Sequence, residues 1–308
     1  MKIGFLGLGH MGGPMALNAL KKAGVPVVVY DPNPAAMAIL TEAGAIAATS
    51  AKDVGDQAEI VFACLRPLSI NISAALGKDG VIHGNTVRTY VEMSTMGLKT
   101  ADQLLEGFKG SPITLVDSPI SGGVRGAVAG TLSTMMAGPK AAMDLVEPLM
   151  RTFCKEVFRV GERPGLGQVC KLTNNAISNA AMVATAEALV VGVKAGIDPD
   201  QLLEIINAST GRNSHSVNQF PQHVLTRKFK YGSYLGTGVK DLTLYCDMAH
   251  ELDVPIWMGT AVAEIRRAAV RHLGEDKDIS NLIQFIEHLA GVEVKGKAAP
   301  AANDPKKD

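Results

Sequence analysis

Residues 2–14 read KIGFLGLGHMGGP, and their pattern is the strongest indication of the fold class. Its first five residues are a short apolar run typical of a buried strand. Gly7, Gly9 and Gly12 then give the spacing G-x-G-x-x-G directly before a segment with helical periodicity. The pattern predicts a strand, a tight turn and a helix, which is the first unit of an alternating α/β fold.

Beyond this segment, short β-branched runs continue to alternate with segments of helical length. The expected strands are residues 2–6, 26–30, 58–63, 87–93 and 113–116, with two further candidates at 132–137 and 156–160. Such alternation predicts right-handed βαβ units and a mostly parallel sheet covered by helices on both faces. We therefore expect an α/β fold with an N-terminal Rossmann-like sheet.

Asp31 ends the second expected strand, about twenty residues after the glycine loop, where a carboxylate can accept hydrogen bonds from an adenine ribose. Together the two features predict a dinucleotide site, for which the expected cofactor-binding residues are Gly7, Leu8, Gly9, His10, Met11, Gly12 and Asp31. A carboxylate repels a 2′-phosphate, and no Arg follows it, so NAD is preferred to NADP. The alternatives are that the glycines only form a turn and that Asp31 only ends a strand.

Two more loops follow strands whose carboxyl ends should meet the same edge of the sheet. Leu65 and Thr95 lie in these loops and are expected to form further walls of the cofactor site. A third loop, DSPISGG at 117–123, offers the Ser121 hydroxyl and the backbone N–H groups of Gly122 and Gly123 to a small carboxylate. Its composition is equally compatible with a structural turn.

The pattern changes at Pro164-Gly165, after which only helical periods are found. One long helix is expected from Gly165 to Lys194, and Asp198-Pro199 should start the next. Further helices are expected over 239–252, 256–272 and 280–289. The predicted domains are a dinucleotide-binding domain over 1–163, an all-helical substrate and oligomerisation domain over 164–292, and a disordered tail over 293–308.

A one-sided polar stripe marks the first turns of the long helix: Lys171, Asn174, Asn175, Ser178 and Asn179. Lys171 and Asn175 are one turn apart, so an amine and an amide can converge on one ligand. A Lys in an apolar setting can exchange a proton near neutral pH, which makes Lys171 the candidate acid/base. The alternative is a Lys that snorkels to solvent from a buried helix.

The composition excludes several classes of protein. Lys plus Arg and Asp plus Glu both number 30, so no bulk charge attracts nucleic acid or an anionic membrane surface. Four separated cysteines favour a reducing compartment, the cytoplasm, and the seven His show no metal-binding spacing, so no metal is expected. No signal peptide is recognised, and the apolar run at 176–193 contains Asn179 and Glu187, so no membrane span is expected.

Four ordered motifs resemble signatures of the β-hydroxyacid dehydrogenase family, which includes 3-hydroxyisobutyrate dehydrogenase and tartronate semialdehyde reductase. They are GLGHMGGPM at 7–15, DSPISGG at 117–123, GLGQVCKLTNN at 165–175 and KDL at 240–242. The resemblance implies a Rossmann-like domain and an all-α domain joined by a long helix, assembled as homodimers or homotetramers. It also implies that Lys171 is the catalytic acid/base, that Asn175 and the 121–123 loop bind substrate, and that Thr95 and Lys240 lie beside the nicotinamide.

One segment departs from the family pattern. Hydroxyisobutyrate-type members carry a Trp shortly after the position of Gly211-Arg212, whereas this chain has Asn213, Ser214 and His215. The predicted function is hydride transfer between NAD(H) and a small 3-hydroxy acid or its semialdehyde. The alternatives are a non-catalytic dinucleotide-binding sensor and an imine reductase-like enzyme.

Overall fold

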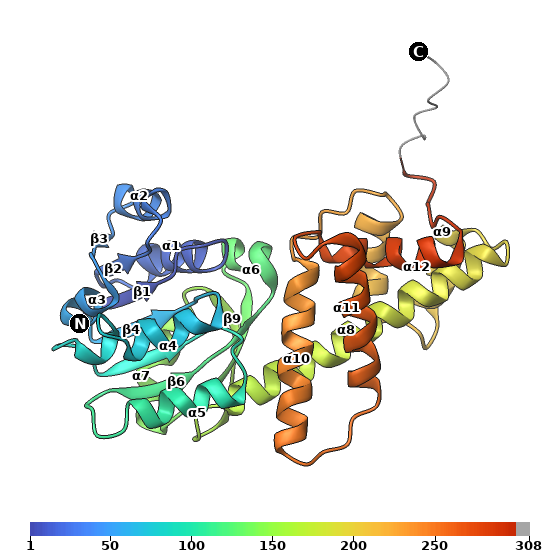
Figure 1. Ribbon diagram of the computed structural model, residues 1–308. Coiled ribbons are helices and arrows are strands. Elements are labelled where there is room, and N and C mark those ends of the chain that lie inside the picture. Colours follow the sequence, from blue (N-terminus) through green and yellow to red (C-terminus); the bar gives the residue numbers. More distant parts are fainter. Residues whose placement is uncertain (300–308) are drawn as a thin grey trace. The chain divides into compact units, whose positions relative to one another are not determined.

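The computed structural model describes residues 1–299 and divides into two compact units, the first Met1–Leu172 and the second beginning at Thr173. Figure 1 shows the elements of each unit. The division falls inside a long helix, whereas the sequence places the domain boundary at 163/164. The helix continues through the division, because nothing in its sequence breaks the backbone hydrogen-bond ladder.

The first unit is built on one nine-stranded sheet. Its strands are β1 (Ile3–Leu6), β2 (Val27–Tyr30), β3 (Ile46–Ala47), β4 (Ile60–Ala63), β5 (Thr89–Glu92), β6 (Thr114–Asp117), β7 (Ile120–Ser121), β8 (Leu132–Ala137) and β9 (Cys154–Gly161). Strands β3-β2-β1-β4-β5-β6 are parallel and follow the Rossmann order, while β8 joins β6 and β7 antiparallel and pairs with β9 in parallel. The strand order therefore reverses between β1 and β4, where doubly wound sheets bind their ligands.

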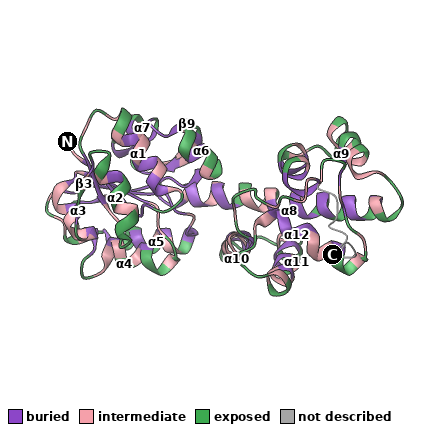
Figure 2. Ribbon diagram, turned by 90° about the horizontal axis from the view of Figure 1, so that it is seen from above, coloured by how far each residue is buried: buried purple, intermediate pink, exposed green. Residues whose placement is uncertain are grey.

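Helices cover both faces of this sheet, because successive side chains of a buried strand point to opposite faces. The helices are α1 (Gly12–Lys22), α2 (Pro34–Glu42), α3 (Ala51–Gln57), α4 (Leu68–Leu76), α5 (Leu98–Gly107), α6 (Gly123–Ala129) and α7 (Lys140–Met150), with a 3₁₀ turn η1 (Val81–His83). Apolar residues of α1, α2, α6 and α7 form one core cluster with the sheet, and those of α3, α4 and α5 form another. The central strands β1, β4 and β5 are accordingly buried along their whole length (Figure 2), whereas β9 is largely exposed.

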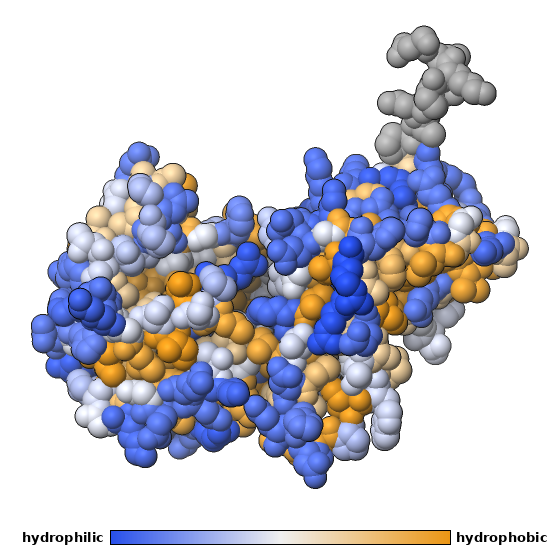
Figure 3. Space-filling view, viewed as in Figure 1, coloured by the Kyte–Doolittle hydropathy of each residue, from blue (hydrophilic) through white to orange (hydrophobic). Residues whose placement is uncertain are grey.

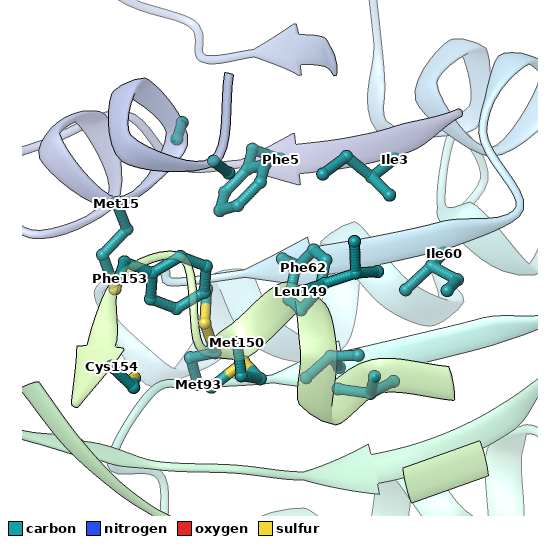
Figure 4. Packing of buried hydrophobic residues seen from close by; sticks show 14 of the residues in the cluster. Ile3, Phe5, Met15, Ile60, Phe62, Met93, Leu149, Met150, Phe153 and Cys154 are labelled. Atoms are coloured by element: carbon teal, nitrogen blue, oxygen red, sulfur yellow. The ribbon is translucent and has the colours of Figure 1, made fainter. Parts of the chain in front are cut away.

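Three aromatic rings lie at the centre of the first core cluster. Phe5 and Phe62 come from the neighbouring strands β1 and β4 and stack with ring centroids 5.0 Å apart (Figure 4). Phe153 meets both of them edge to face. This packing fixes β1 against β4, the two strands that flank the point where the strand order reverses.

The second unit is helical. It contains most of α8 (Leu166–Lys194) together with α9 (Pro199–Ala208), η2 (His215–Val224, a π-helix), α10 (Leu235–Glu251), α11 (Met258–Leu273), η3 (Ile279–Asn281) and α12 (Leu282–Ala290). Asp198 caps α9 by accepting a hydrogen bond from the Gln201 N–H, as predicted. By length and composition α8 is the one helix of residues 1–299 that could cross a membrane. Its Met182, Ala186 and Leu189 belong instead to the core of this unit.

The structure differs from the sequence prediction in several details. Helix α10 starts at Leu235, whereas the sequence predicts a start at 239. The prediction missed the first turn because Gly236 and Gly238 weaken the helical pattern there. The segment His215–Val224 was not predicted as an element. Within the expected tail, Val294 is fully buried, and its N–H donates to Glu287. The rest of that tail, from residue 300, lies outside the described residues.

Hydrophilic residues are spread over the visible face of both units, with apolar residues between them (Figure 3). Some ion pairs among the described residues are local pairs on one helix, such as Lys52 with Asp56, and others join different elements, such as Arg159 with Asp144 and Arg227 with Glu287.

Candidate functional site

The glycine loop joins β1 to α1 at the point where the strand order reverses. Gly7 has a φ of 84°, and a Cβ placed on it would lie 2.3 Å from the carbonyl oxygen of Cys64. A Cβ on Gly12 would lie 1.8 Å from the carbonyl oxygen of Gly7. The protein's own backbone therefore requires glycine at these two positions.

Gly9 is different, because a Cβ there would meet no protein atom within 4 Å and its φ is not positive. Nothing in the protein itself requires glycine at this position. The close approach of a ligand to the backbone does explain it, since the second glycine of the motif admits the pyrophosphate. No side chain caps α1 and no acidic residue lies in its first turn, so its N–H groups suit an anion.

Asp31 follows β2 and holds the glycine loop. Its Oδ2 accepts the Leu8 N–H at 2.7 Å, and its Oδ1 accepts the Asn33 N–H at 2.8 Å. Each carboxylate oxygen keeps a further lone pair, so both can still accept ribose hydroxyls. These residues fit a nicotinamide dinucleotide.

Leu65 and Thr95 follow the carboxyl ends of β4 and β5, as predicted from the order of the strands. The Leu65 N–H donates to Ser94 Oγ at 2.8 Å, which ties the two loops together. Beneath them, Glu92 is fully buried and accepts the Ser94 N–H at 2.8 Å. Burial raises the pKa of Glu92 to about 7, and the nearby charge of Asp117 adds to the increase.

The 117–123 loop follows β6. Gly122 and Gly123 have φ values of 127° and 64°, and both residues are exposed. Thr134 anchors the loop from β8, because its hydroxyl donates to the carbonyl oxygens of Ser118 and Pro119 at 3.1 Å. Positive φ values at consecutive glycines turn backbone N–H groups outward, and such groups bind carboxylates.

Asp117 begins this loop and also fixes the start of α8. Its Oδ2 accepts the N–H groups of Gly165 and Gln168, both at 3.0 Å. Burial raises the pKa of Asp117 to about 6, and the hydrogen bonds to Gln168 and Gly165 partly oppose that increase. The carboxylate thus serves as the cap of the helix that carries Lys171.

Lys171 lies in the second turn of α8 and is 7% exposed. Asn175 lies one turn further along the same helix, in the second unit. There the Asn175 amide donates to Asp241 Oδ2 at 2.8 Å, while Lys240 Nζ lies 3.0 Å from Asp241 Oδ1. Sequence reasoning did not single out Asp241, although it belongs to the KDL motif.

The distal part of the polar stripe contacts the π-helix η2. Ser178 and His215 form a hydrogen bond of 2.8 Å, and the other ring nitrogen of His215 contacts Gln219. Burial lowers the pKa of His215, so the ring is neutral near pH 7. The residue that stands in the segment where the family carries Trp is therefore a buried, neutral hydrogen-bonding group.

The predicted site residues are divided between the two units. The glycine loop, Asp31, Leu65, Thr95, the 121–123 loop and Lys171 all belong to the first unit. Asn175 and Lys240 belong to the second unit and meet at Asp241. Asn174, also part of the stripe, is exposed. Among residues 1–299, no group of three or more His, Cys, Asp or Glu side chains could hold a metal ion.

Comparison with known proteins agrees with this geometry. Residues 2–161 match the NAD-binding domain of 6-phosphogluconate dehydrogenase, and residues 165–286 match the NAD-binding region of NADP-dependent 3-hydroxyisobutyrate dehydrogenase. Two curated relatives and one solved structure are especially similar.

The 2-(hydroxymethyl)glutarate dehydrogenase of Eubacterium barkeri is 33% identical over 96% of this chain and 98% of its own length. The 3-hydroxyisobutyrate dehydrogenase of Pseudomonas aeruginosa is 41% identical over 68% of this chain and 70% of its own length. The structure of Mycobacterium tuberculosis 3-hydroxyisobutyrate dehydrogenase with L-serine superposes with a TM-score of 0.83 at 27% identity, covering 92% of this chain and 98% of that one.

Fold and site together define a dinucleotide-dependent oxidoreductase with a Rossmann sheet followed by a helical unit. The chain belongs to the β-hydroxyacid dehydrogenase family. It is an NAD(P)-linked enzyme of hydroxy acid oxidation, which excludes the alternative of a non-catalytic sensor.

The glycine loop generates a prediction that separates folding from cofactor binding. Gly12→Ala should unfold or strongly destabilise the protein, because its Cβ would overlap the Gly7 carbonyl oxygen. Gly9→Ala should change the free energy of unfolding by less than about 1 kcal/mol, because the protein leaves room for the methyl group. It should nevertheless weaken NADH binding at least about tenfold. Thermal melts and NADH fluorescence titrations check this, and parent-like NADH affinity in Gly9→Ala would contradict it.

The buried Glu92 predicts a pH dependence of stability. Since its pKa is raised on folding, the folded state binds more protons than the unfolded state, and stability falls as pH rises from about 4.5 to about 7. Glu92→Gln should remove about 2 kcal/mol of that fall. Urea denaturation at about pH 5 and pH 8 measures it, with exposed Glu156→Gln as the control. Equal slopes in parent and Glu92→Gln would show that Glu92 does not titrate in this range.

Proposed function

We propose that this enzyme oxidises acids of the form HOCH₂–CH(R)–COO⁻ to the corresponding semialdehydes, with Lys171 as the acid/base. Two compounds for which the relatives are named, 3-hydroxyisobutyrate and 2-(hydroxymethyl)glutarate, and the L-serine of the similar structure share this hydroxymethyl acid group and differ only in R. A shared reacting group with variable R is what a common site with different side-chain walls would produce.

The main support for this proposal is the position of Lys171. Its side chain is nearly buried, and it lies one turn after the start of α8, which Asp117 fixes. A bound NAD⁺ would supply the acceptor for the hydride of the hydroxymethyl carbon. Lys171, as the neutral amine, takes the hydroxyl proton as the C–O bond gains double-bond character. In reduction the ammonium form returns that proton to the oxygen.

Other residues bind and orient the substrate in this proposal. The Ser121 hydroxyl and the N–H groups of Gly122 and Gly123 hold the carboxylate. The Asn175 amide donates one N–H to Asp241, which leaves its second N–H available to the substrate. Thr95 and Lys240 border the nicotinamide, and Leu65 borders the remainder of the cofactor.

We further propose a cytoplasmic homodimer or homotetramer, with domains close to those predicted at 1–163 and 164–292. Large apolar side chains exposed between α10 and α11 support assembly, since Val254 is 51%, Trp257 80% and Met258 68% exposed. Large apolar side chains exposed close together in the sequence are typical of an interaction site.

The first test addresses Lys171 directly. Lys171→Met should bind NADH within about threefold of the parent while kcat for the best hydroxymethyl acid falls about 10²- to 10⁴-fold. Lys171→Arg should restore little, because a guanidinium stays protonated. Lys194→Met, on the last turn of the same helix, is the control and should keep parent activity. A Lys171→Met enzyme that turns over within about threefold of the parent would refute the acid/base role.

The cofactor preference follows from Asp31. The parent should prefer NAD⁺ to NADP⁺ at least about tenfold in kcat/KM, since that ratio needs only about 1.4 kcal/mol of like-charge repulsion. Asp31→Asn removes the charge and should bring the ratio within about threefold. Initial rates with both cofactors measure it, and equal efficiency in the parent would contradict the preference.

A further inference from the structure

Gln168 lies in the first turn of α8 and is fully buried. Its side-chain Oε1 accepts the N–H groups of Met96 and Gly97, at 2.9 and 3.1 Å. Its Nε2 donates to the Ser94 carbonyl oxygen at 3.0 Å and to Asp117 Oδ1 at 2.7 Å. Both N–H groups of the side-chain amide therefore donate, and its oxygen accepts two hydrogen bonds, so every polar atom of the amide is paired.

These bonds join three segments that are distant in sequence. Residues 94–97 follow β5, Asp117 ends β6, and Gln168 belongs to α8. Gly167 brings the helix close enough for this, since a Cβ on it would lie 2.4 Å from the Met135 carbonyl oxygen and 2.7 Å from Asp117 Oδ2. The start of α8 is therefore held against the sheet by tight packing and by a shared hydrogen-bond network.

The network extends to the cofactor side of the site. Ser94 Oγ accepts the Leu65 N–H at 2.8 Å and the Asn71 side-chain amide at 2.9 Å. A continuous chain of hydrogen bonds therefore leads from Leu65, through Ser94, to Gln168. Thr95 lies within the segment that Gln168 holds on both sides, through the Ser94 carbonyl and the Met96 N–H.

Lys171 is three residues after Gln168, and residues three apart share a face of a helix. We infer that Gln168 is a positioning residue for the reaction: it sets Lys171 in register with the Thr95 segment that borders the nicotinamide. This inference rests on the proposed function of Lys171. A displacement of about 1 Å between reacting groups can cost about a hundredfold in rate, so one amide can matter without touching substrate.

The test is a double-mutant cycle in the full-length enzyme. Gln168→Met keeps the volume but breaks the four side-chain bonds, and kcat should fall at least about tenfold while NADH affinity stays within about threefold. If Gln168 acts through Lys171, the double variant Gln168→Met/Lys171→Met should be no slower than Lys171→Met alone. Losses that multiply in the double variant would show a merely structural role and overturn the inference.

Thr86→Val is the matched control. It removes a 2.6 Å hydrogen bond to the Asp56 carbonyl oxygen on the amino-end side of β5, away from Lys171. It should lower the melting temperature without lowering kcat. If it lowers kcat as much as Gln168→Met does, the effect of Gln168 is one of general stability and the inference fails.

Gln168→Glu decides the question if Gln168→Met does not fold. Its carboxyl would keep both acceptor bonds but would face Asp117 from β6 and, through Ser94, Glu92 from β5. The ratio of its kcat to that of the parent should fall at least about tenfold as pH rises and this group ionises. A ratio independent of pH would overturn the inference.

The proposed function and the positioning role can fail separately. Parent-like turnover in Lys171→Met would refute the function of Lys171 itself. A slow Lys171→Met beside a Gln168→Met variant within about threefold of the parent would refute only the positioning role.

Discussion

The buried carboxylate of Asp117 is the constraint on which the rest of the site depends. It ends β6, accepts two backbone N–H groups from the first turn of α8, and accepts a third hydrogen bond from Gln168. Burying a carboxylate is unfavourable, and its pKa of about 6 reflects that cost. The hydrogen bonds offset the cost and determine where the 29-residue helix begins.

The start of α8, the helix that carries Lys171, is thereby attached to the end of β6 in the sheet. A parallel sheet brings the carboxyl ends of β1, β2, β4 and β5 to one edge, so the glycine loop, Asp31, Leu65 and Thr95 converge there. Gln168, three residues before Lys171 on α8, hydrogen-bonds to Ser94, Met96 and Gly97 at this edge. Further along α8, Asn175 is oriented by Asp241, which lies beside Lys240 on α10.

Much of this arrangement is predictable because it depends on local patterns. Glycines 7 and 12 are required by the backbone, and the strand runs, the long helix and the Asp198 cap were recognised from short-range signals. The capping role of Asp117 was not predicted from the sequence, because the two residues whose N–H groups it accepts lie 48 and 51 residues later. Gln168 was missed for the same reason, although it stands within a recognised motif. The π-helix η2 contains Pro221, which obscures a helical pattern.

The most direct measurement of the central claim is a crystal structure with NADH and a bound hydroxymethyl acid. We expect Lys171 Nζ within about 2.6 to 3.2 Å of the substrate hydroxyl oxygen, with the Gln168 hydrogen bonds to Met96, Gly97 and Asp117 intact. A substrate hydroxyl paired with another side chain, with Lys171 directed to solvent, would contradict it.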